Sequence, residues 1–496
     1  MKKTRILTIA ALVAFALAGC IKDKAGGGID SLSSGADAKM SISITLPGAA
    51  TRAPIGTPVE GTASESAVNF VNIYVFNASG AAVAAGANTR LAVNTTNFTI
   101  SGNTYTTRNA IETVAGNNIV YVGINIPAAI ANKSFADEGA LLLEIADVED
   151  LYVADDFYMF SDATPKAMAE YTTSSGVVND VKVYVDRIIA KVAVTSPNAT
   201  VAKEWVETVA GAGDNYLGLE LVYRFAHFAP YNNAKKSYIA PRYWVGGKLA
   251  GSNRTYAPGI GAGSPTAYPN LYTFAESNGT AYQRANVWTA ALPTNLNDLP
   301  TAYIGENIPE EALVGNTSNV YVSTVVLVNK AARWDATLAT PGVVYEDVTP
   351  YGYKSPGPSD DVWVVKKTNA PQMGFCFITD TEAKANDIAN GFGGAGEATK
   401  IQYTKGWVHF PVYLDGIATS HGLNQYGVAR NQFIRANVTG VAGGPGQFPG
   451  IPGDEKPEYP DPRDPDDPID GKLAKLNVEV EVNPWDYIVN DDKILQ

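Results

Sequence analysis

Apolar and polar residues alternate along several short stretches of this chain. From position 40 to position 46 every second residue is apolar, which would give an extended strand one apolar and one polar face. Similar runs, rich in Val, Ile, Tyr and Phe, are separated by Gly, Pro, Asn and Asp, a pattern typical of an all-β protein with many turns. The predicted strands are Met40–Leu46, Phe70–Phe76, Ile119–Ile126, Val181–Val194, Leu217–Phe225, Val320–Val328, Val362–Val365, Gly374–Ile378, Trp407–Leu414, Phe433–Val441 and Lys475–Val482.

Other segments predict a helix, loops and an extended arm. A short helix is expected near Glu138–Ile145, and residues 229–300, rich in Tyr, Asn, Gly and Pro, are expected to form long loops. Residues 454–470 carry prolines at 457, 460, 462, 465 and 468, so this acidic segment should be extended. It would act as an arm that carries the last predicted strand.

Length and charge narrow the classes of function. The 496 residues suffice for about two to four domains. There are 37 Lys and Arg residues against 50 Asp and Glu residues, a net charge of −13, and no basic run. Because nucleic-acid binding depends on Lys and Arg replacing phosphate counterions, nucleic acid is excluded as a partner.

Residues that could support catalysis or bind a metal are scarce. Two cysteines, Cys20 and Cys376, exclude a disulfide framework and a cysteine-based zinc site, and three scattered histidines indicate no metal centre. His227 and His409 could each belong to a catalytic triad, but no nucleophile motif accompanies them. Cys376 lies in an apolar run and is expected to be a buried, unreactive thiol. We therefore expect no enzyme, no cofactor and no metal.

Two segments resemble binding motifs but have plainer interpretations. Residues 391–396 fit the glycine pattern of dinucleotide-binding loops, which requires a preceding strand and a following helix. Residues 383–390 are instead helix-like and a strand follows, so we interpret the glycines as a turn. The aspartates at 461, 464, 466 and 467 could bind Ca²⁺, but the prolines among them forbid the glycine turn of a calcium loop. An acidic spacer is the better interpretation.

The first twenty residues form an export signal. Basic residues at positions 2, 3 and 5 precede the apolar stretch Ile6–Leu17, which is too short to span a bilayer as a helix. The stretch leads to Ala18-Gly19-Cys20, which resembles a bacterial lipoprotein signal. Cleavage between Gly19 and Cys20 would leave Cys20 as the lipidated residue, and Ile21, in place of the Asp of inner-membrane signals, favours the outer membrane. A Gly/Ser-rich tether then leads to the first strand, which is followed by the Pro-rich loop 49–61.

Six segments stand in an order and spacing that extend over nearly the whole mature chain. In the first half they are Phe70–Gly80, Val114–Pro127 and Val181–Val194, the last with Arg187 and Ala190-Lys191-Val192. In the second half they are Gly305-Glu306-Asn307, Val428-Ala429-Arg430-Asn431 and Leu476–Asp486. In these segments the chain resembles the fimbrillins of Bacteroidales, the shaft pilins of FimA type and more closely those of the minor-fimbrium Mfa type.

The resemblance implies two transthyretin-like β-sandwich domains and processing by an arginine-specific protease. Arg52 is the only arginine between the tether and the first sandwich, so the cut would fall between Arg52 and Ala53. The expected parts are a signal peptide, 1–19; a propeptide, 20–52; an N-terminal sandwich, 53–195; a C-terminal sandwich, 196–452; and an arm with a donor strand, 453–496.

The resemblance also implies polymerisation by strand exchange. Removal of residues 20–52 would take away both the lipid anchor and a strand, leaving an apolar groove with unpaired backbone edges that can recruit another chain. The displaced strand would contribute Met40, Ile42, Ile44 and Leu46, and the donor strand, with the same spacing, Leu476, Val478, Val480 and Val482. A head-to-tail contact that does not close produces a filament.

The sequence thus predicts a shaft subunit of an outer-membrane fimbrium that supports adhesion. Its partners would be identical subunits, tip, accessory and anchor subunits, the protease and, in the precursor, the outer membrane. A tip or accessory subunit is one alternative, although tip subunits generally lack a donor strand and anchor subunits lack the arginine cut. Another alternative is a carbohydrate-binding surface lipoprotein that uses tyrosines of residues 229–288.

Overall fold

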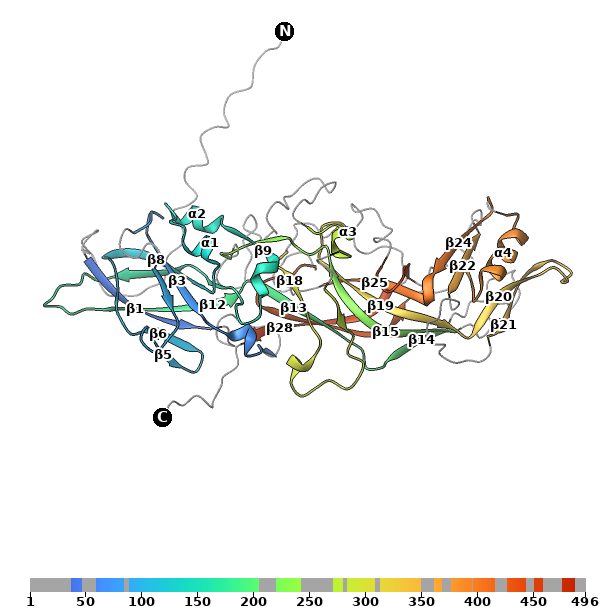
Figure 1. The fold of residues 1–496 in the computed structure, drawn as a ribbon, viewed down its shortest axis with the longest axis horizontal. Coiled ribbons are helices and arrows are strands. Elements are labelled where there is room, and N and C mark those ends of the chain that lie inside the picture. The colour runs from blue at the N-terminus through green and yellow to red at the C-terminus, as the bar shows by residue number, and fades with distance from the viewer. Residues whose placement is uncertain are drawn as a thin grey trace, which may run out of the picture.

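The computed structural model describes residues 37–46, 59–83, 89–204, 220–241, 271–279, 283–307, 313–348, 361–367, 376–394, 396–414, 426–442, 450–457 and 475–486. Figure 1 shows an elongated molecule in which β-sheets follow one another along the long axis. Among these residues strands dominate and the longest helix has 10 residues, so the all-β prediction is confirmed. The division into two transthyretin-like sandwiches with the predicted boundaries stays a prediction.

Ten strands at one end of the molecule share a core. Their order is β4-β3-β8-β10-β12-β1-β6-β5, with β11 beside β8 and β7 beside β1. Apolar side chains such as Val71, Val122 and Val183 fill the core between them. The strands are β1 (Asp37–Thr45), β3 (Phe70–Asn77), β4 (Thr89–Ala92), β5 (Phe98–Ser101), β6 (Thr104–Thr107), β7 (Ile111–Val114), β8 (Gly116–Ile124), β10 (Met159–Ser161), β11 (Thr164–Met168) and β12 (Asn179–Arg187). We call them the N-terminal sheets.

Two sheets in the middle of the molecule enclose a second core. One has the order β18-β13-β26-β28-β2, and the other β14-β15-β19-β25-β27 with β17 beside β15. The strands are β2 (Val59–Glu60), β13 (Ile189–Thr195), β14 (Thr200–Glu204), β15 (Glu220–Tyr231), β17 (Ala285–Asn286), β18 (Ala302–Gly305), β19 (Asn319–Val328), β25 (Trp407–Tyr413), β26 (Gln432–Ala442), β27 (Ile451–Pro452) and β28 (Lys475–Asp486). We call them the C-terminal sheets.

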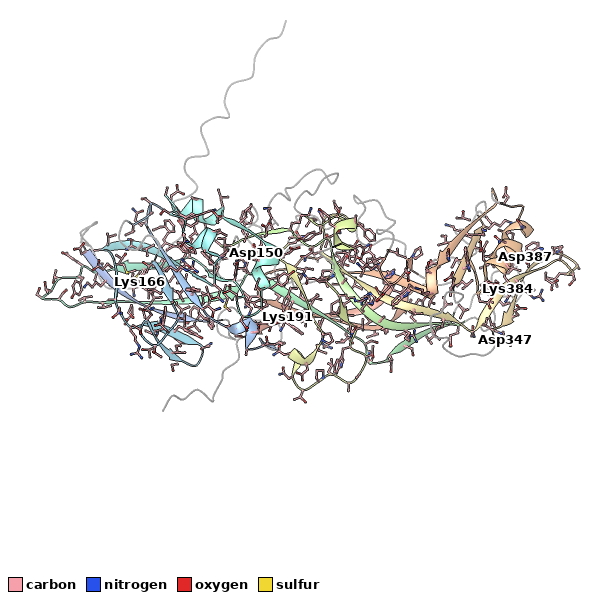
Figure 2. The ribbon with its side chains drawn as sticks, viewed as in Figure 1. Asp150, Lys166, Lys191, Asp347, Lys384 and Asp387 are labelled. Atoms are coloured by element: carbon pink, nitrogen blue, oxygen red, sulfur yellow. The ribbon has the colours of Figure 1, made fainter. Side chains whose placement is uncertain are left out.

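The end of the molecule opposite β1 carries a smaller group of elements (Figure 1). The hairpin β20 (Lys330–Asp335) and β21 (Gly342–Asp347) lies there with the sheet β23-β22-β24 (Cys376–Thr379, Val362–Lys367, Ala398–Tyr403) and helix α4 (Glu382–Gly391). Lys384, Asp387 and Asp347 mark this end in Figure 2. A helix, not a strand, precedes the glycines of residues 391–396, and Gly393 and Gly394 have φ angles of 109° and 90°, which favour glycine. Residues 392–394 form a turn after the helix.

The remaining elements are short. The expected helix near residue 138 is α2 (Glu138–Leu142), which the Asp137 side chain caps by accepting a hydrogen bond from the amide of Ala140. Residues 229–300 were expected to lack strands; β15 nevertheless reaches Tyr231, and β16 and β17 are short strands there. The other elements are α1 (Ala128–Ala131), α3 (Phe274–Ser277), the strand pair β9 (Ile145–Asp147) and β16 (Lys236–Tyr238), and the 3-10 helices η1 (Ser64–Ser66), η2 (Val148–Tyr152), η3 (Leu296–Asp298) and η4 (Thr404–Gly406).

Candidate functional site

Strand β1 lies inside the N-terminal sheets, although it precedes the predicted protease site. It pairs in parallel with β12, from Met40 opposite Asn179 to Thr45 opposite Tyr184. On its other side it pairs antiparallel with β6 and β7. The side chains of Met40, Ile42, Ile44 and Leu46 are all 0% exposed. The alternation read from the sequence therefore places one whole face of β1 in the core.

Side-chain hydrogen bonds add to the backbone ladder that holds β1 in place. The amide of Ile42 donates to the hydroxyl of Thr107 at 3.0 Å, and the Asn179 side chain donates to the carbonyl of Lys39 at 2.9 Å. The hydroxyls of Ser43 and Thr106 are 3.0 Å apart. The backbone ladder and the buried apolar face also hold β1, and an apolar strand of different sequence but the same spacing could provide both.

Strand β28 occupies a place in its own chain's C-terminal sheets. It pairs antiparallel with β26, from Gln432 opposite Pro484 to Ala442 opposite Lys475. Its far end pairs in parallel with β2, where Val59 faces Trp485. The side chain of Leu476 is 8% exposed and belongs to the C-terminal core. The side chains of Val478, Val480 and Val482, and the arm at 458–474, lie outside the described residues.

The directions of β1 and β28 are related through β12 and β13. Because β1 runs parallel to β12, its Asp37 end points away from the C-terminal sheets. Strand β13 runs parallel to β26, and β28 runs against β26, so the Lys475 end of β28 points away from the N-terminal sheets. A β28 that swung outward about Lys475 would leave the molecule on the side opposite β1.

The predicted processing residues lie outside the described residues. These are Gly19 and Cys20 at the signal cut and Arg52 and Ala53 at the propeptide cut. Along the sequence, the described residues nearest to Arg52 are Leu46 and Val59. Leu46 is buried next to the end of β1, and Val59 begins β2. A cut after Arg52 would therefore separate β1, which lies between β12 and β6, from β2, which lies beside β28.

Residues that carried the sequence resemblance meet at a buried junction between the N-terminal and C-terminal sheets. Arg187, at the end of β12, is 0% exposed and donates to the carbonyl of Glu65 and to the hydroxyl of Ser66, both at 2.9 Å. The Asn431 side chain donates to the carboxylate of Asp186 at 3.0 Å. These hydrogen bonds thus connect three segments, near residues 65, 187 and 431, that are far apart in the sequence.

Arg430 and Glu306 form a fully buried ion pair at this junction. Their side chains are 0% exposed and 2.7 Å apart. Arg430 also donates to the carbonyl groups of Ile239 and Tyr238, at 2.8 and 3.0 Å. The guanidinium group is therefore satisfied by several acceptors, which offsets the cost of its burial.

Lys191 and Glu65 form the second buried ion pair, with the Lys191 amine 3.0 Å from the carboxylate. The hydroxyl of Tyr303 donates to the same carboxylate at 2.8 Å, and the Lys191 amine also donates to the side-chain oxygen of Asn297 at 3.0 Å. Burial raises the pKa of Glu65, but the charge of Lys191 and hydrogen bonds outweigh burial and hold this pKa below its usual value. Burial lowers the pKa of Lys191 to about 8, although Glu65 opposes the shift.

Sequence reasoning missed Glu65. It stands in the polar segment Ser64-Glu65-Ser66, which has no pattern that sets it apart from an exposed loop. In the structure it is 3% exposed, because the 3-10 helix η1 places it over Lys191 and Tyr303. Only its three-dimensional partners, each more than a hundred residues away, give it a role.

The histidines considered for catalysis occupy the core. His409 is 0% exposed and Ser323 is 1% exposed. The ring Nδ1 of His409 lies 2.8 Å from the hydroxyl of Ser323, and Nε2 lies 2.9 Å from the backbone carbonyl of Asp454. Burial lowers the pKa of His409 to about 3, so the ring is neutral and Nε2 donates to the carbonyl. Enclosed in this way, the pair gives no access to a substrate.

The described residues offer no other candidate centre. Among them, no group of three or more His, Cys, Asp or Glu side chains is arranged to hold a metal ion. No helix within the described part of the chain is long and apolar enough to cross a membrane.

Comparison with solved structures finds adhesion and fimbrial proteins. A candidate cell adhesion protein from Parabacteroides distasonis is similar over 92% of this chain and 98% of its own, with 14% identity and a TM-score of 0.46. A fimbrilin from Porphyromonas gingivalis is similar over 91% of this chain and 99% of its own, with 15% identity and a TM-score of 0.43. A C-terminally truncated tip fimbrial protein from the same species is similar over 90% of this chain and 100% of its own, with 12% identity and a TM-score of 0.37.

These neighbours are of the kind that the sequence resemblance named. They are adhesion and fimbrial proteins rather than enzymes. No protein-family model matches the chain, and no curated protein matches it.

Proposed function

We propose that this chain is a structural subunit of a surface fimbrium, made as a lipoprotein, cleaved after Arg52 and polymerised by donor-strand exchange. The observation that carries the proposal is the position of β1. A strand buried between β12 and β6, with four side chains at 0% exposure, precedes the predicted cut, so cleavage would free it from the rest of the chain.

Loss of β1 would leave a groove in the N-terminal sheets. The groove would be lined by core side chains and edged by unpaired backbone groups of β12 on one side and of β6 and β7 on the other. Such edges bind a further strand through backbone hydrogen bonds, while alternate side chains fill the groove. Four side chains of the donor would contribute roughly 6–12 kcal/mol before the costs of ordering, at about 1.5–3 kcal/mol each.

The strand directions support a head-to-tail arrangement. A β28 that swings out about Lys475 leaves the molecule on the side opposite β1, and would enter the next subunit at the Asp37 end of its groove. It would then run from Lys475 to Asp486 in the same direction as the β1 that it replaces. Leu476, Val478, Val480 and Val482 would take the places of Met40, Ile42, Ile44 and Leu46 without a reversal of the chain.

The test is the substitution Arg52→Ala in the full precursor. We expect a longer form that retains β1 and remains unpolymerised, because the groove stays filled. N-terminal sequencing of wild-type surface polymer should begin at Ala53. Arg108→Ala is the matched control, since Arg108 is exposed on the N-terminal sheets, and should polymerise normally. Polymer assembled from Arg52→Ala chains that still contain Met40 would refute the proposal.

A further inference from the structure

The cluster around Lys191 brings together the groups needed to exchange one amide for another. The amine of Lys191 lies 3.0 Å from the side-chain oxygen of Asn297 and 3.0 Å from a carboxylate oxygen of Glu65. An amine, an amide carbonyl and a proton-accepting carboxylate are thus in contact. Figure 2 shows Lys191 in the middle of the long molecule, where the N-terminal and C-terminal sheets meet.

The surroundings of the cluster keep water away from the amine. Lys191 is 1% exposed and Glu65 is 3% exposed, and the amine lies 5.3 Å from the centre of the Phe433 ring. Tyr303, which donates to Glu65, packs against the rings of Tyr152 and Phe157. Burial lowers the pKa of Lys191 to about 8, which favours the neutral, nucleophilic form of the amine.

The local structure also fixes the backbone that carries the Asn297 side-chain amide. Asn297 lies in η3, where its backbone amide donates to the Asn295 side chain at 3.0 Å and the amide of Leu299 donates to the carbonyl of Leu296 at 3.2 Å. Holding two reacting groups in contact replaces a bimolecular encounter by an intramolecular one and favours the reaction strongly. The side chain of Asn297 is only half-buried, so a small leaving group has a way out.

We propose that Lys191 and Asn297 form a covalent amide bond, with Glu65 as the proton carrier. The carboxylate of Glu65 takes one proton from the Lys191 ammonium group, and the neutral amine nitrogen that results forms a bond to Cγ of Asn297. The bond from Cγ to Nδ2 breaks, the departing nitrogen receives the second amine proton, and ammonia leaves. Glu65 ends protonated, or passes its proton on to give ammonium. No oxidant, metal or cofactor takes part.

The proposed bond would tie β13 to η3, two segments 106 residues apart in sequence. It is a single reaction of the chain on itself, and it does not depend on whether the protein polymerises. The ion pair alone, without the covalent bond, is the competing account of the same contacts.

Intact-mass spectrometry of the purified, denatured full chain tests the proposal. We expect a mass lower by one ammonia than the processed sequence requires. A tryptic digest should contain one branched peptide joining Lys191 to Asn297, because trypsin does not cut after an acylated lysine. Lys191→Met and Asn297→Ala should each restore the full mass, and Glu65→Gln should leave most of the chains unlinked.

Glu306→Gln is the matched control, because it alters the neighbouring buried ion pair but not the reacting groups; its chains should still lack one ammonia. An unmodified wild-type mass would overturn the proposal, and that measurement needs no variant to fold. A mass loss that persists in Asn297→Ala would also overturn it. A loss without the branched peptide would point to ring closure at Asn297 instead and would equally contradict the amide bond.

Discussion

Within the described part of the chain, several buried charged side chains lie where the N-terminal and C-terminal sheets meet. Arg187, Lys191 and Arg430 are each at most 3% exposed, and each has an acceptor within 3.0 Å. Removing one partner of such a pair leaves the other charge buried and uncompensated, which costs far more than losing an exposed pair. The junction is therefore sensitive to single substitutions.

Glu306→Ala should reduce the free energy of unfolding by about 3–5 kcal/mol, because Arg430 would keep its charge in a site without a counterion. Urea denaturation followed by fluorescence would measure the change. Asp347→Ala is the matched control, since Asp347 pairs with Lys330 on the surface and its loss should cost less than about 1 kcal/mol. Equal effects of the two substitutions would contradict the role assigned to the junction.

His409 should make the protein less stable in acid. Its folded-state pKa of about 3 lies below the ordinary value of 6.5, so the unfolded chain binds a proton first as the pH falls. The stability that His409 contributes is complete above pH 6.5 and is lost progressively toward pH 3, by about 1.4 kcal/mol per pH unit.

Urea midpoints measured between about pH 7 and pH 4 would check this, by comparison of the wild type with His409→Gln. The amide of Gln can donate to the Asp454 carbonyl and accept from Ser323 but does not titrate. The difference in stability between the two proteins should therefore shrink as the pH falls. A constant difference would show that the ring does not titrate on unfolding.

At the scale of elements, strands with a clean alternation could be predicted from the sequence. The runs that predicted β1, β3 and β28 fall close to the observed bounds. In β1 the period of two reflects one buried face, whereas β3 is an apolar run that is buried on both faces. The run Val181–Val194 was expected to be one long strand, but it is two. Strand β12 ends at Arg187 and β13 begins at Ile189, in different sheets. The charged pair Asp186-Arg187 breaks the run at this point, but a local break does not reveal that the chain changes partner strands.

The candidate site was only partly predictable. The apolar face of β1 followed from its sequence, whereas the pairing of β28 with β26 and β2 in its own chain did not, because register between distant segments depends on the assembled sheet. Arg187, Lys191 and Arg430 came from a resemblance, and Glu65, Tyr303 and Asn297 had no signal at all. Long-range polar partners cannot be read from local pattern.

A reversible cross-link between β26 and β28 should block polymerisation. Asn437 and Glu479 are directly opposed, at a separation suited to a disulfide, so Asn437→Cys with Glu479→Cys, in a Cys376→Ser background, would hold β28 in its own chain. Electron microscopy of oxidised, Arg52-cleaved protein should show monomers, and reductant should restore fibres.

Arg224→Cys with Val325→Cys, which joins β15 to β19, is the matched control and should polymerise when oxidised. If the β26–β28 cross-link leaves fibres unchanged, some other segment is the donor.

At the scale of the whole molecule, the predicted attachment to the outer membrane depends on one residue, Cys20. Cys20→Ala should abolish labelling with a lipid precursor and stop the chain before it reaches the surface, because the predicted lipid is attached through that thiol. Labelling with radioactive palmitate and surface proteolysis would measure both effects. Cys376→Ser, the other cysteine, should leave both unchanged, and normal surface display of Cys20→Ala would contradict the lipoprotein assignment.

The near-continuity of β12 and β13 has a mechanical consequence. Only Ile188 separates them, and together they lead from the N-terminal sheets into the C-terminal sheets along the long axis. Tension along that axis would be transmitted across the junction by covalent backbone rather than by side-chain contacts alone. The hydrogen bonds between β12 and β1 lie across the direction of pull. Tension would therefore load these hydrogen bonds in shear, and they would share the force.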